Sequence, residues 1–260
     1  MKKLLFIFAL FFSISTFAQG DLYLIFELMK VDNEQENAYW ETESFWEKIH
    51  QERVKSGDII GWDLWALQPG GETQGFQYMT VTLFNSAKAM FEGGNNMMES
   101  VKKAYPNMSE DELNKKFINT AKTRDLAVRI FLKEIATTKD SFDMPLGTIA
   151  FINSMKVDLD NYGDYEKAEM EVFQPMHQKE VENGTMASWG LLRFMLPIGS
   201  DTYASHMTVD MYKDIDQALS RNGGGDMSNL TEAQRKAIQD GIATRDMKMV
   251  NMGTLVKKVR

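Results

Sequence analysis

Histidine is the side chain best suited to proton transfer near neutral pH, and two of the three histidines in this 260-residue chain occupy equivalent places. His50 opens the stretch HQERVKSGDIIGW (50–62), and His177 opens HQKEVENGTMASW (177–189). His, Gln, Val, Gly and Trp recur at the same five offsets. A duplicated active site and a duplicated piece of scaffold both account for this pair.

The element that must carry each of these histidines is a helix. Apolar residues before His50 recur at helical spacing, with Trp46 and Ile49 on one side. Gly57 stands where a helix C-terminus favours left-handed geometry, and Gly184 stands there in the second stretch. His50 therefore lies at the border of an apolar stripe, either reaching into a pocket as a base or donor, or bonded to a backbone carbonyl or nearby acid.

The repeat extends well beyond this motif. FELMKVDN (26–33) matches INSMKVDL (152–159), YMTVTLF (78–84) matches HMTVDMY (206–212), and KTRD (122–125) matches ATRD (243–246). A divergent tandem duplication explains the near-constant offsets, and a unit of this length has the size of a small domain. We expect a signal peptide at 1–18, a first repeat at 19–140 and a second repeat at 141–260.

Each copy has the pattern of a βαββαβ unit. In the first copy, strand-like runs cover 22–31, 61–67, 76–84 and 125–135, while 35–56 and 86–123 have helical character. Capping boxes at Ser109 with Glu112 and at Thr231 with Gln234 mark the start of a late helix in each copy. The order is that of the ferredoxin-like split βαβ fold, an antiparallel sheet with helices on one face.

The alternation along the strands predicts how the other face is covered. One parity is apolar or small, and the opposite parity is mixed. The apolar set comprises Leu22, Leu24, Phe26, Leu28, Trp65, Leu67, Met79, Val81 and Leu83 in the first copy, and Ile152, Leu192, Phe194, Met207, Val209 and Met211 in the second. We expect these two faces to pack on each other, with the mixed faces under the helices.

This layout resembles the dimeric α+β barrel superfamily, which includes antibiotic-biosynthesis-monooxygenase-like, NIPSNAP-like and EthD-like proteins. The resemblance covers residues 22 to about 258 and rests on topology, the Gly-to-Trp spacing and the duplication. It implies an α+β fold in which two tandem ferredoxin-like repeats form one intramolecular barrel. It also implies a ligand pocket between sheet and helices. Some members carry haem on one histidine; no haem-family motif is visible here, so we expect no cofactor, with haem as the alternative.

The second copy has the richer set of candidate site residues. His206 stands where the first copy has Tyr78, and it shares the helix-facing parity with Asn153 and Arg193. We predict His177 and His206 as catalytic base and hydrogen-bond partner, with Asn153 and Arg193 holding an oxyanion. Scattered polar groups with structural roles are the alternative.

The matching polar set of the first copy is Tyr78, Glu27 and His50. Trp62 and Trp189 begin the second strand of each copy, as a packing anchor or as a wall that stacks on a flat ligand.

Arginines mark the start of the last strand in both copies. Arg124 precedes Asp125, and Arg245 precedes Asp246. We expect a local ion pair or a favourable charge at a helix C-terminus, with anion binding as the alternative.

Other chemistries are excluded by what is missing. There is no Walker loop, no G-x-G-x-x-G after a strand, no H-E-x-x-H and no G-x-S-x-G. With zero cysteines and three dispersed histidines, we expect no metal site.

The first residues have the features of an export signal. Lys2 and Lys3 precede the apolar run LLFIFALFFSIS, and cleavage after Ala18 leaves 242 residues. With 27 basic and 37 acidic residues, this remainder has a net charge of −10, which disfavours nucleic acid and anionic membranes as partners. We expect a periplasmic or secreted monomer or homodimer.

Two functions fit these residues. The first is binding of a small molecule under the helices, with cofactor-independent oxygenase or isomerase chemistry. The second is a non-catalytic ligand-binding or scaffold protein whose histidines are structural.

Overall fold

A computed structural model describes residues 21–69, 73, 75–94, 96–220 and 230–260. The expected signal peptide lies outside these residues. No helix in the described ranges has both the length and the apolar character needed to cross a membrane.

Eight antiparallel strands form a closed barrel in the order β1-β3-β2-β8-β5-β7-β6-β4. The strands of the first half are β1 (Tyr23–Lys30), β2 (Gly61–Gln68), β3 (Tyr78–Phe84) and β4 (Asp125–Thr137). Those of the second half are β5 (Ile149–Lys156), β6 (Ser188–Leu196), β7 (His206–Tyr212) and β8 (Asp246–Val259). Each half has the same internal order, fourth-first-third-second, so the two halves are topologically equivalent.

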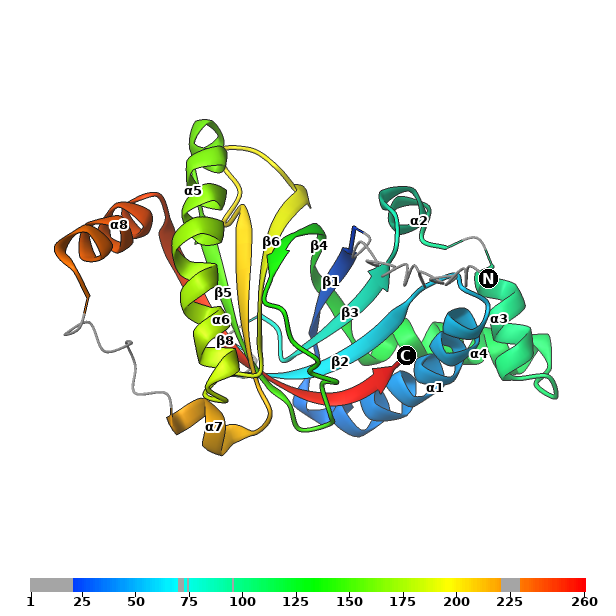
Figure 1. Ribbon diagram of the computed structural model, residues 1–260. Helices are drawn as coiled ribbons and strands as arrows, with labels where there is room; N and C mark the ends of the chain where they lie inside the picture. The colour runs from blue at the N-terminus through cyan, green and yellow to red at the C-terminus, as the bar shows by residue number, and fades with distance from the viewer. Residues whose placement is uncertain (1–20, 70–72, 74, 95, 221–229) are drawn as a thin grey trace, which may run out of the picture.

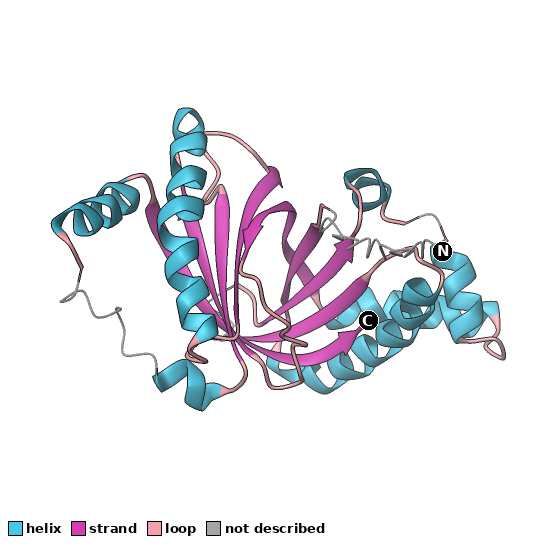
Figure 2. Cartoon of the chain, viewed as in Figure 1, coloured by secondary structure: helices cyan, strands magenta, loops and turns pink. Residues whose placement is uncertain are grey.

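The helices cover the outside of the barrel on two opposite sides (Figures 1 and 2). On one side are α1 (Glu36–Lys55), α2 (Ala87–Glu92), α3 (Met97–Ala104) and α4 (Glu110–Thr123). On the other are α5 (Tyr162–Ala168), a π-helical turn (Glu169–Phe173), α6 (Gln174–Glu182), α7 (Ile215–Ser220) and α8 (Glu232–Ala243). Short 3₁₀ turns at Asn33–Gln35 and Leu159–Asn161 precede α1 and α5.

The helix ends follow the sequence signals. Gly57 and Gly184 have φ of +74° and +75°, the left-handed geometry expected after α1 and α6. Both capping boxes are formed, with Ser109 starting α4 and Thr231 starting α8. Each box satisfies backbone donors that the first helical turn leaves free.

The barrel interior is the main hydrophobic core, and it confirms the predicted packing of the two apolar faces. Leu24, Phe26 and Trp65 of the first half lie in one cluster with Ile152 and Phe194 of the second. The halves are also joined through their edges, because β2 pairs with β8 and β4 pairs with β6. Pairing of these edges satisfies backbone groups that two separate stacked sheets would expose to water.

The mixed faces lie under the helices, as the alternation predicted. Trp62, Leu64 and Tyr78 are buried in a cluster beneath α1, and Trp189 and Leu191 are buried beneath α5 and α6. The sheet is therefore covered on both sides.

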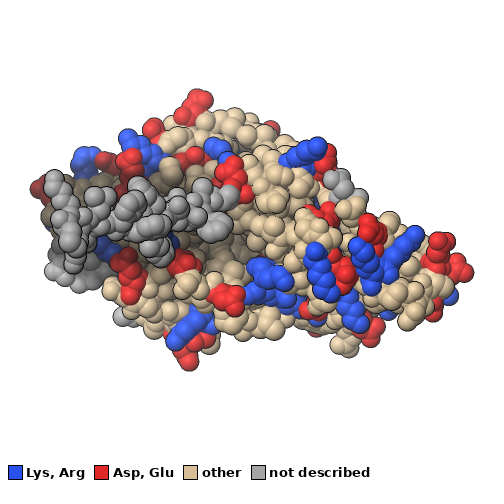
Figure 3. Space-filling view, turned by 45° about the vertical axis from the view of Figure 1, so that its right-hand side comes forward, with Lys and Arg blue, Asp and Glu red and all other residues tan. Residues whose placement is uncertain are grey.

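The surface carries both signs of charge. On the face shown in Figure 3, Lys and Arg side chains are interspersed with Asp and Glu, and neither sign forms a continuous stripe.

Candidate functional site

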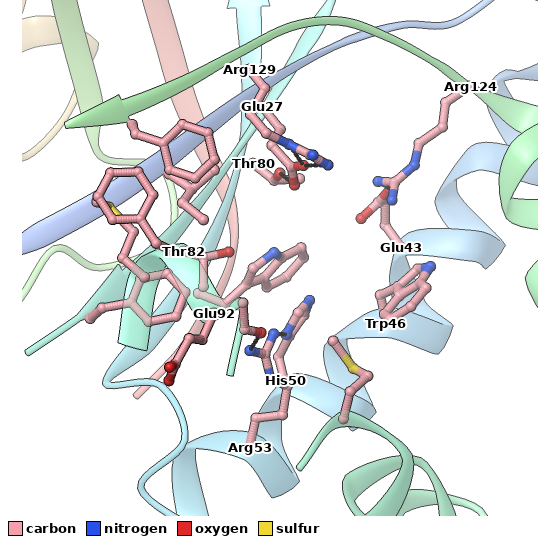
Figure 4. Close-up of a pocket in the computed structure, with 18 residues that line it drawn as sticks. Glu27, Glu43, Trp46, His50, Arg53, Thr80, Thr82, Glu92, Arg124 and Arg129 are labelled. Atoms are coloured by element: carbon pink, nitrogen blue, oxygen red, sulfur yellow. Dashed lines mark hydrogen bonds and ion pairs between the residues drawn. The ribbon is translucent and has the colours of Figure 1, made fainter. Parts of the chain in front are cut away.

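A cavity of about 390 Å³ lies between the sheet and the helices of the first half (Figure 4), and we call it the helix-side cavity. It is lined from β1, α1, β2, β3, α2, the start of α3 and β4. Its charged residues are Glu27, Glu43, Arg53, Glu92, Arg124 and Arg129, and its aromatic residues are Trp46, His50, Trp62, Phe84, Phe91 and Phe131. Charged groups thus surround a mostly aromatic interior.

One face of α1 supplies four of these groups. Glu43, Trp46, His50 and Arg53 are spaced by three, four and three residues, which places them in a row along one side of a helix. Glu43 and His50 lie seven residues apart, or about 10 Å along the axis at ~1.5 Å per residue.

His50 is held between two indoles. Its ring lies 4.9 Å from that of Trp62 and 6.0 Å from that of Trp46, both stacked. Nδ1 lies 3.5 Å from Nη1 of Arg53. A guanidinium can only donate, so Nδ1 is the acceptor and the proton of the neutral imidazole is on Nε2.

Burial, helped by the nearby Arg53 charge, lowers the pKa of His50 well below its ordinary value. The ring is therefore neutral at physiological pH. No described residue hydrogen-bonds to Nε2, and Figure 4 shows the ring directed into the cavity. His50 thus presents an N–H donor to whatever occupies the cavity.

Glu43 is the second polar group of the row. Its Oε1 accepts a hydrogen bond from Arg124, and its Oε2 is buried without a hydrogen-bond partner. Burial raises the pKa of Glu43 to about 7, aided by Glu27 and opposed by Arg124 and Lys257. A carboxylate with one free oxygen and a pKa near neutrality suits general base catalysis.

The Glu43–Arg124 pair belongs to a motif that both halves contain. Tyr39 is fully buried beside Glu43, just as Tyr165 is fully buried beside Glu169. In the second half, Arg245 Nη1 lies 3.3 Å from Oε1 of Glu169. We call these the two Tyr–Glu–Arg clusters.

These clusters correct the expected role of the arginines. Arg124 and Arg245 pair with acids of the first helix rather than with sequence neighbours, although Arg245 also bonds the carbonyl oxygen of Gly241 in the preceding helix. Each pair ties a helix to the start of the last strand. The sequence analysis missed them, but the recurring Tyr-x-x-x-Glu spacing at 39–43 and 165–169 was a readable signal.

A π-helical turn distinguishes the second half. The second half has one additional residue across Glu169–Phe173. Glu43 corresponds to Glu169 at an offset of 126, whereas His50 corresponds to His177 at an offset of 127. Extra residues in helices are commonly accommodated as π turns. The ring of Phe173 then lies close to Gly241, where a Cβ would come within 2.9 Å of it.

His177 repeats the stacking of His50 but has a different partner. Its ring stacks on that of Trp189 at 5.2 Å, and its Nδ1 lies 3.1 Å from Oε2 of Glu180. A carboxylate accepts, so Nδ1 carries a proton, the reverse of the arrangement at His50.

His206 is fully buried in β7. Its Nε2 lies 3.1 Å from Glu166 and its Nδ1 lies 3.0 Å from Oγ of Ser205. Arg193 shares Glu166 at 3.1 Å. Both ring nitrogens are thus engaged within the protein, and burial lowers the pKa of His206 despite Glu166.

The structure places the remaining predicted second-half residues in separate contacts. The side chain of Asn153 donates to Thr208 and Asp210, and Trp189 is buried. The contacts of His177 and His206 share no residue, and neither histidine lines any of the main cavities of the described chain. The catalytic pairing of these histidines stays a prediction that the observed contacts do not favour.

The predicted first-half residues lie nearer to one another. Glu27 lines the helix-side cavity and pairs with Arg129 at 2.6 Å. Trp62 lines it as well, beneath His50. Tyr78 does not line it, and donates a hydrogen bond to Glu36 instead. Within the described residues, no three His, Asp or Glu side chains gather in a way that would hold a metal ion.

Comparison with known proteins shows the fold. The sequence matches no family profile and no curated protein. Solved structures do match, and a putative monooxygenase from Lactobacillus acidophilus NCFM aligns over 93% of this chain and 96% of its own at 9% identity, with a TM-score of 0.55. A putative monooxygenase from Fusobacterium nucleatum aligns over 93% and 94% at 11% identity, with a TM-score of 0.54.

Two further structures extend this set. An anthrone oxidase-like protein aligns over 93% of both chains at 10% identity, and a putative chlorite dismutase over 92% and 96% at 8% identity, each with a TM-score of 0.50. These likenesses show the class of fold: a closed antiparallel barrel of eight strands with helices on its outside. At this identity they say nothing of the chemistry.

Proposed function

We propose that this protein binds a small, flat organic molecule in the helix-side cavity and removes a proton from it, in a cofactor-independent oxygenase or isomerase reaction. The observation that carries this proposal is that Glu43 and His50, two turns apart on one face of α1, line the same cavity. A carboxylate with a pKa near 7 and a neutral imidazole N–H together suit abstraction of a proton from carbon beside a carbonyl.

The two groups have complementary roles. The carboxylate of Glu43 takes the proton, and Nε2–H of His50 donates to the oxygen on which negative charge develops. The indoles of Trp46 and Trp62 hold the imidazole in place and keep water away from it. Arg124, already paired with Glu43, stabilises the carboxylate form of the base before the reaction.

Anthrone is a suitable test substrate, because one solved structure of this fold is called anthrone oxidase-like. Glu43 removes a proton from the anthrone methylene carbon, giving an anion whose oxygen accepts from His50. The anion reduces dioxygen to a bound peroxide anion, which takes back the proton from Glu43 to form a hydroperoxide, and this loses water to give anthraquinone. One anthrone and one dioxygen thus yield one anthraquinone and one water.

The experiment compares two equivalent glutamates. Glu43→Gln removes the base and is expected to lower the rate of dioxygen-dependent anthraquinone formation by about 10² to 10⁴. Glu169→Gln removes the matching acid of the second half, which lines no main cavity, and is expected to leave the rate within about twofold. Equal loss in both variants, or no turnover above the protein-free rate, contradicts the proposal.

Haem fits these residues poorly. His206 has both ring nitrogens engaged, and His177 lines none of the main cavities of the described residues. The free nitrogen of His50 faces the Glu43–Arg124 pair rather than an apolar slot. We therefore route no step through haem and expect the purified protein to lack a Soret band.

A specific observation favours a non-catalytic second half. His177 and His206 are both hydrogen-bonded within the protein, which is what structural histidines require. We infer that only the first half keeps the site. If His177→Ala or His206→Ala lowers turnover as much as Glu43→Gln without loss of stability, this inference is wrong.

The duplication and export complete the proposal. The shared strand order, the stacked His–Trp pairs and the Tyr–Glu–Arg clusters support two tandem ferredoxin-like repeats at 19–140 and 141–260. We also propose that the chain is exported and cleaved after Ala18. N-terminal sequencing of the protein recovered from a periplasmic or culture fraction tests this, and an intact Met1 there contradicts it.

A further inference from the structure

A second cavity lies inside one end of the barrel, on the opposite face of the sheet from the helix-side cavity. It has a volume of about 420 Å³, within the ~300–1,000 Å³ typical of small-molecule sites. Its lining is almost wholly apolar, with Ile130, Ile152, Phe194 and Met207 among its walls. We call it the barrel-end cavity.

Two buried polar side chains interrupt this apolar lining. Ser154 of β5 is 5% exposed and Asn251 of β8 is 9% exposed. The strand register pairs Ile152 with Asn251 and Ser154 with Met249, so the hydroxyl and the amide are diagonal neighbours on the inner face.

Neither polar side chain has a hydrogen-bond partner among the described residues. Both line the cavity, so their polar atoms are within reach of a molecule bound there. Burying a hydroxyl or an amide without a partner costs stability. Both groups are therefore free to bond something inside the cavity.

The first half of the chain has an equivalent wall, formed by β1 and β4, in which the two polar residues are absent. Strands β1 and β4 pair Phe26 with Ile130 and Leu28 with Val128, in the same register as the β5–β8 pairs. When the two repeats are aligned, Leu28 corresponds to Ser154, and Ile130 corresponds to Asn251. One copy of the wall is apolar and the other carries the two polar groups, so barrel packing does not require them.

The cavity also has an apolar mouth. Val128, Tyr203 and Met249 line it and are 39%, 56% and 36% exposed. Exposed large apolar groups around a concave opening favour entry of an apolar molecule. No charged side chain lines the cavity, so an ion would lose its hydration without gaining a partner.

We propose that the barrel-end cavity binds an uncharged, mainly apolar small molecule with one carbonyl or hydroxyl group, which Ser154 and Asn251 recognise. The amide of Asn251 and the hydroxyl of Ser154 both donate and accept, so either group is satisfied. This site is separate from the helix-side cavity and does not depend on the reaction proposed there.

The neutral fluorescent ketone prodan is the probe. Its emission shifts to the blue and strengthens in apolar surroundings, so its affinity for the full chain is read by titration. Asn251→Leu, close in shape, is expected to weaken prodan binding about fivefold to tenfold, the equivalent of one hydrogen bond. Ser154→Ala is expected to give a smaller loss in the same direction.

A second probe separates polar recognition from apolar fit. 2-(Dimethylamino)naphthalene has the same rings without the ketone, and Asn251→Leu is expected to change its affinity less than twofold. Ala204→Phe, which places a ring in the cavity, is expected to weaken both probes at least tenfold. Circular dichroism and denaturant unfolding identify any variant that fails to fold, and Asn251→Leu alone then carries the test.

Control variants show which of the two cavities the probe occupies. Thr82→Phe narrows the helix-side cavity and Thr80→Val removes a hydroxyl there; both are expected to leave prodan affinity unchanged. Loss of binding in Thr82→Phe but not in Ala204→Phe puts the probe in the other cavity and overturns the proposal. Absence of prodan binding, or equal affinity of the native chain and Asn251→Leu, also overturns it.

Discussion

The imidazole of His50 lies parallel to the indole of Trp62, with ring centroids 4.9 Å apart and planes inclined by 18°. His177 and Trp189 repeat this stack at 5.2 Å and 20°. The residue three positions later differs, since Arg53 contacts one imidazole and Glu180 the other. The same scaffold therefore holds the two rings in opposite protonation patterns.

This difference predicts the tautomers. We expect the proton of neutral His50 on Nε2, and a proton on Nδ1 of His177. Nitrogen-15 NMR of the imidazoles distinguishes these forms directly. Arg53→Met removes the donor to Nδ1 of His50 and is expected to give a mixture of tautomers, while His177 stays unchanged. A protonated Nδ1 on His50 in the native protein contradicts the assignment.

The pKa of Glu43 predicts the pH dependence of turnover. The base must be ionised, and burial raises its pKa to about 7. We therefore expect kcat/KM for anthrone to rise tenfold per pH unit below about 7 and to level off above it. The residual rate of Glu43→Gln should lack this rise. A native profile that is flat from pH 5 to 8 shows that Glu43 is not the base.

Removing the arginine from each of two ion pairs of the first half is expected to lower the free energy of unfolding by unequal amounts. Arg124→Met leaves Glu43 buried without its partner and is expected to lower the free energy of unfolding by about 3–5 kcal/mol at pH 8. Arg129→Met removes the partner of Glu27, but Arg129 is half exposed, so a loss under about 1 kcal/mol is expected. Urea unfolding measures both. Equal losses of unfolding free energy in the two variants would mean that burial of the ion pair does not determine how much its removal destabilises the protein.

The raised pKa of Glu134 is expected to make the stability of the protein depend on pH. It lies beside an end of the barrel near Asp140, and burial raises its pKa from 4.5 to about 7. Since the folded state resists ionisation, the native protein loses stability as pH rises from about 4.5 to 7, and the loss is constant above that. At ~1.4 kcal/mol per pKa unit, the full loss is about 3–4 kcal/mol.

Glu134→Gln cannot ionise and should avoid this loss. Relative to the native protein, we expect its free energy of unfolding to gain about 3 kcal/mol between pH 4.5 and pH 8 in urea unfolding. The exposed Glu232→Gln is the control and should track the native protein at both pH values. A parallel shift of Glu134→Gln at both pH values would show that its carboxyl is solvated in the folded state.

The site shows where sequence reasoning succeeded and where it could not. The offset of 127 identified His50 and Trp62 as a structural unit, and alternation placed Glu27 and Trp62 beneath the helices. It did not identify Glu43, because a lone acid on an amphipathic helix looks like a solvated residue. Only its burial in the folded chain raises its pKa to about 7, against the opposing charge of Arg124, which lies 81 residues later in the sequence.

The sequence by itself determined the repeat, the strand and helix order and which face of each strand is apolar, because these depend on local periodicity and on turn and cap residues. The tertiary structure decided that the first half has a cavity under its helices, because the residues that line it come from distant segments of the chain. In the second half, it brought Glu166 to His206 and the ring of Phe173 to Gly241. It also decided that two polar side chains face an apolar space inside the barrel, because closing the barrel turns Ser154 and Asn251 toward a shared interior.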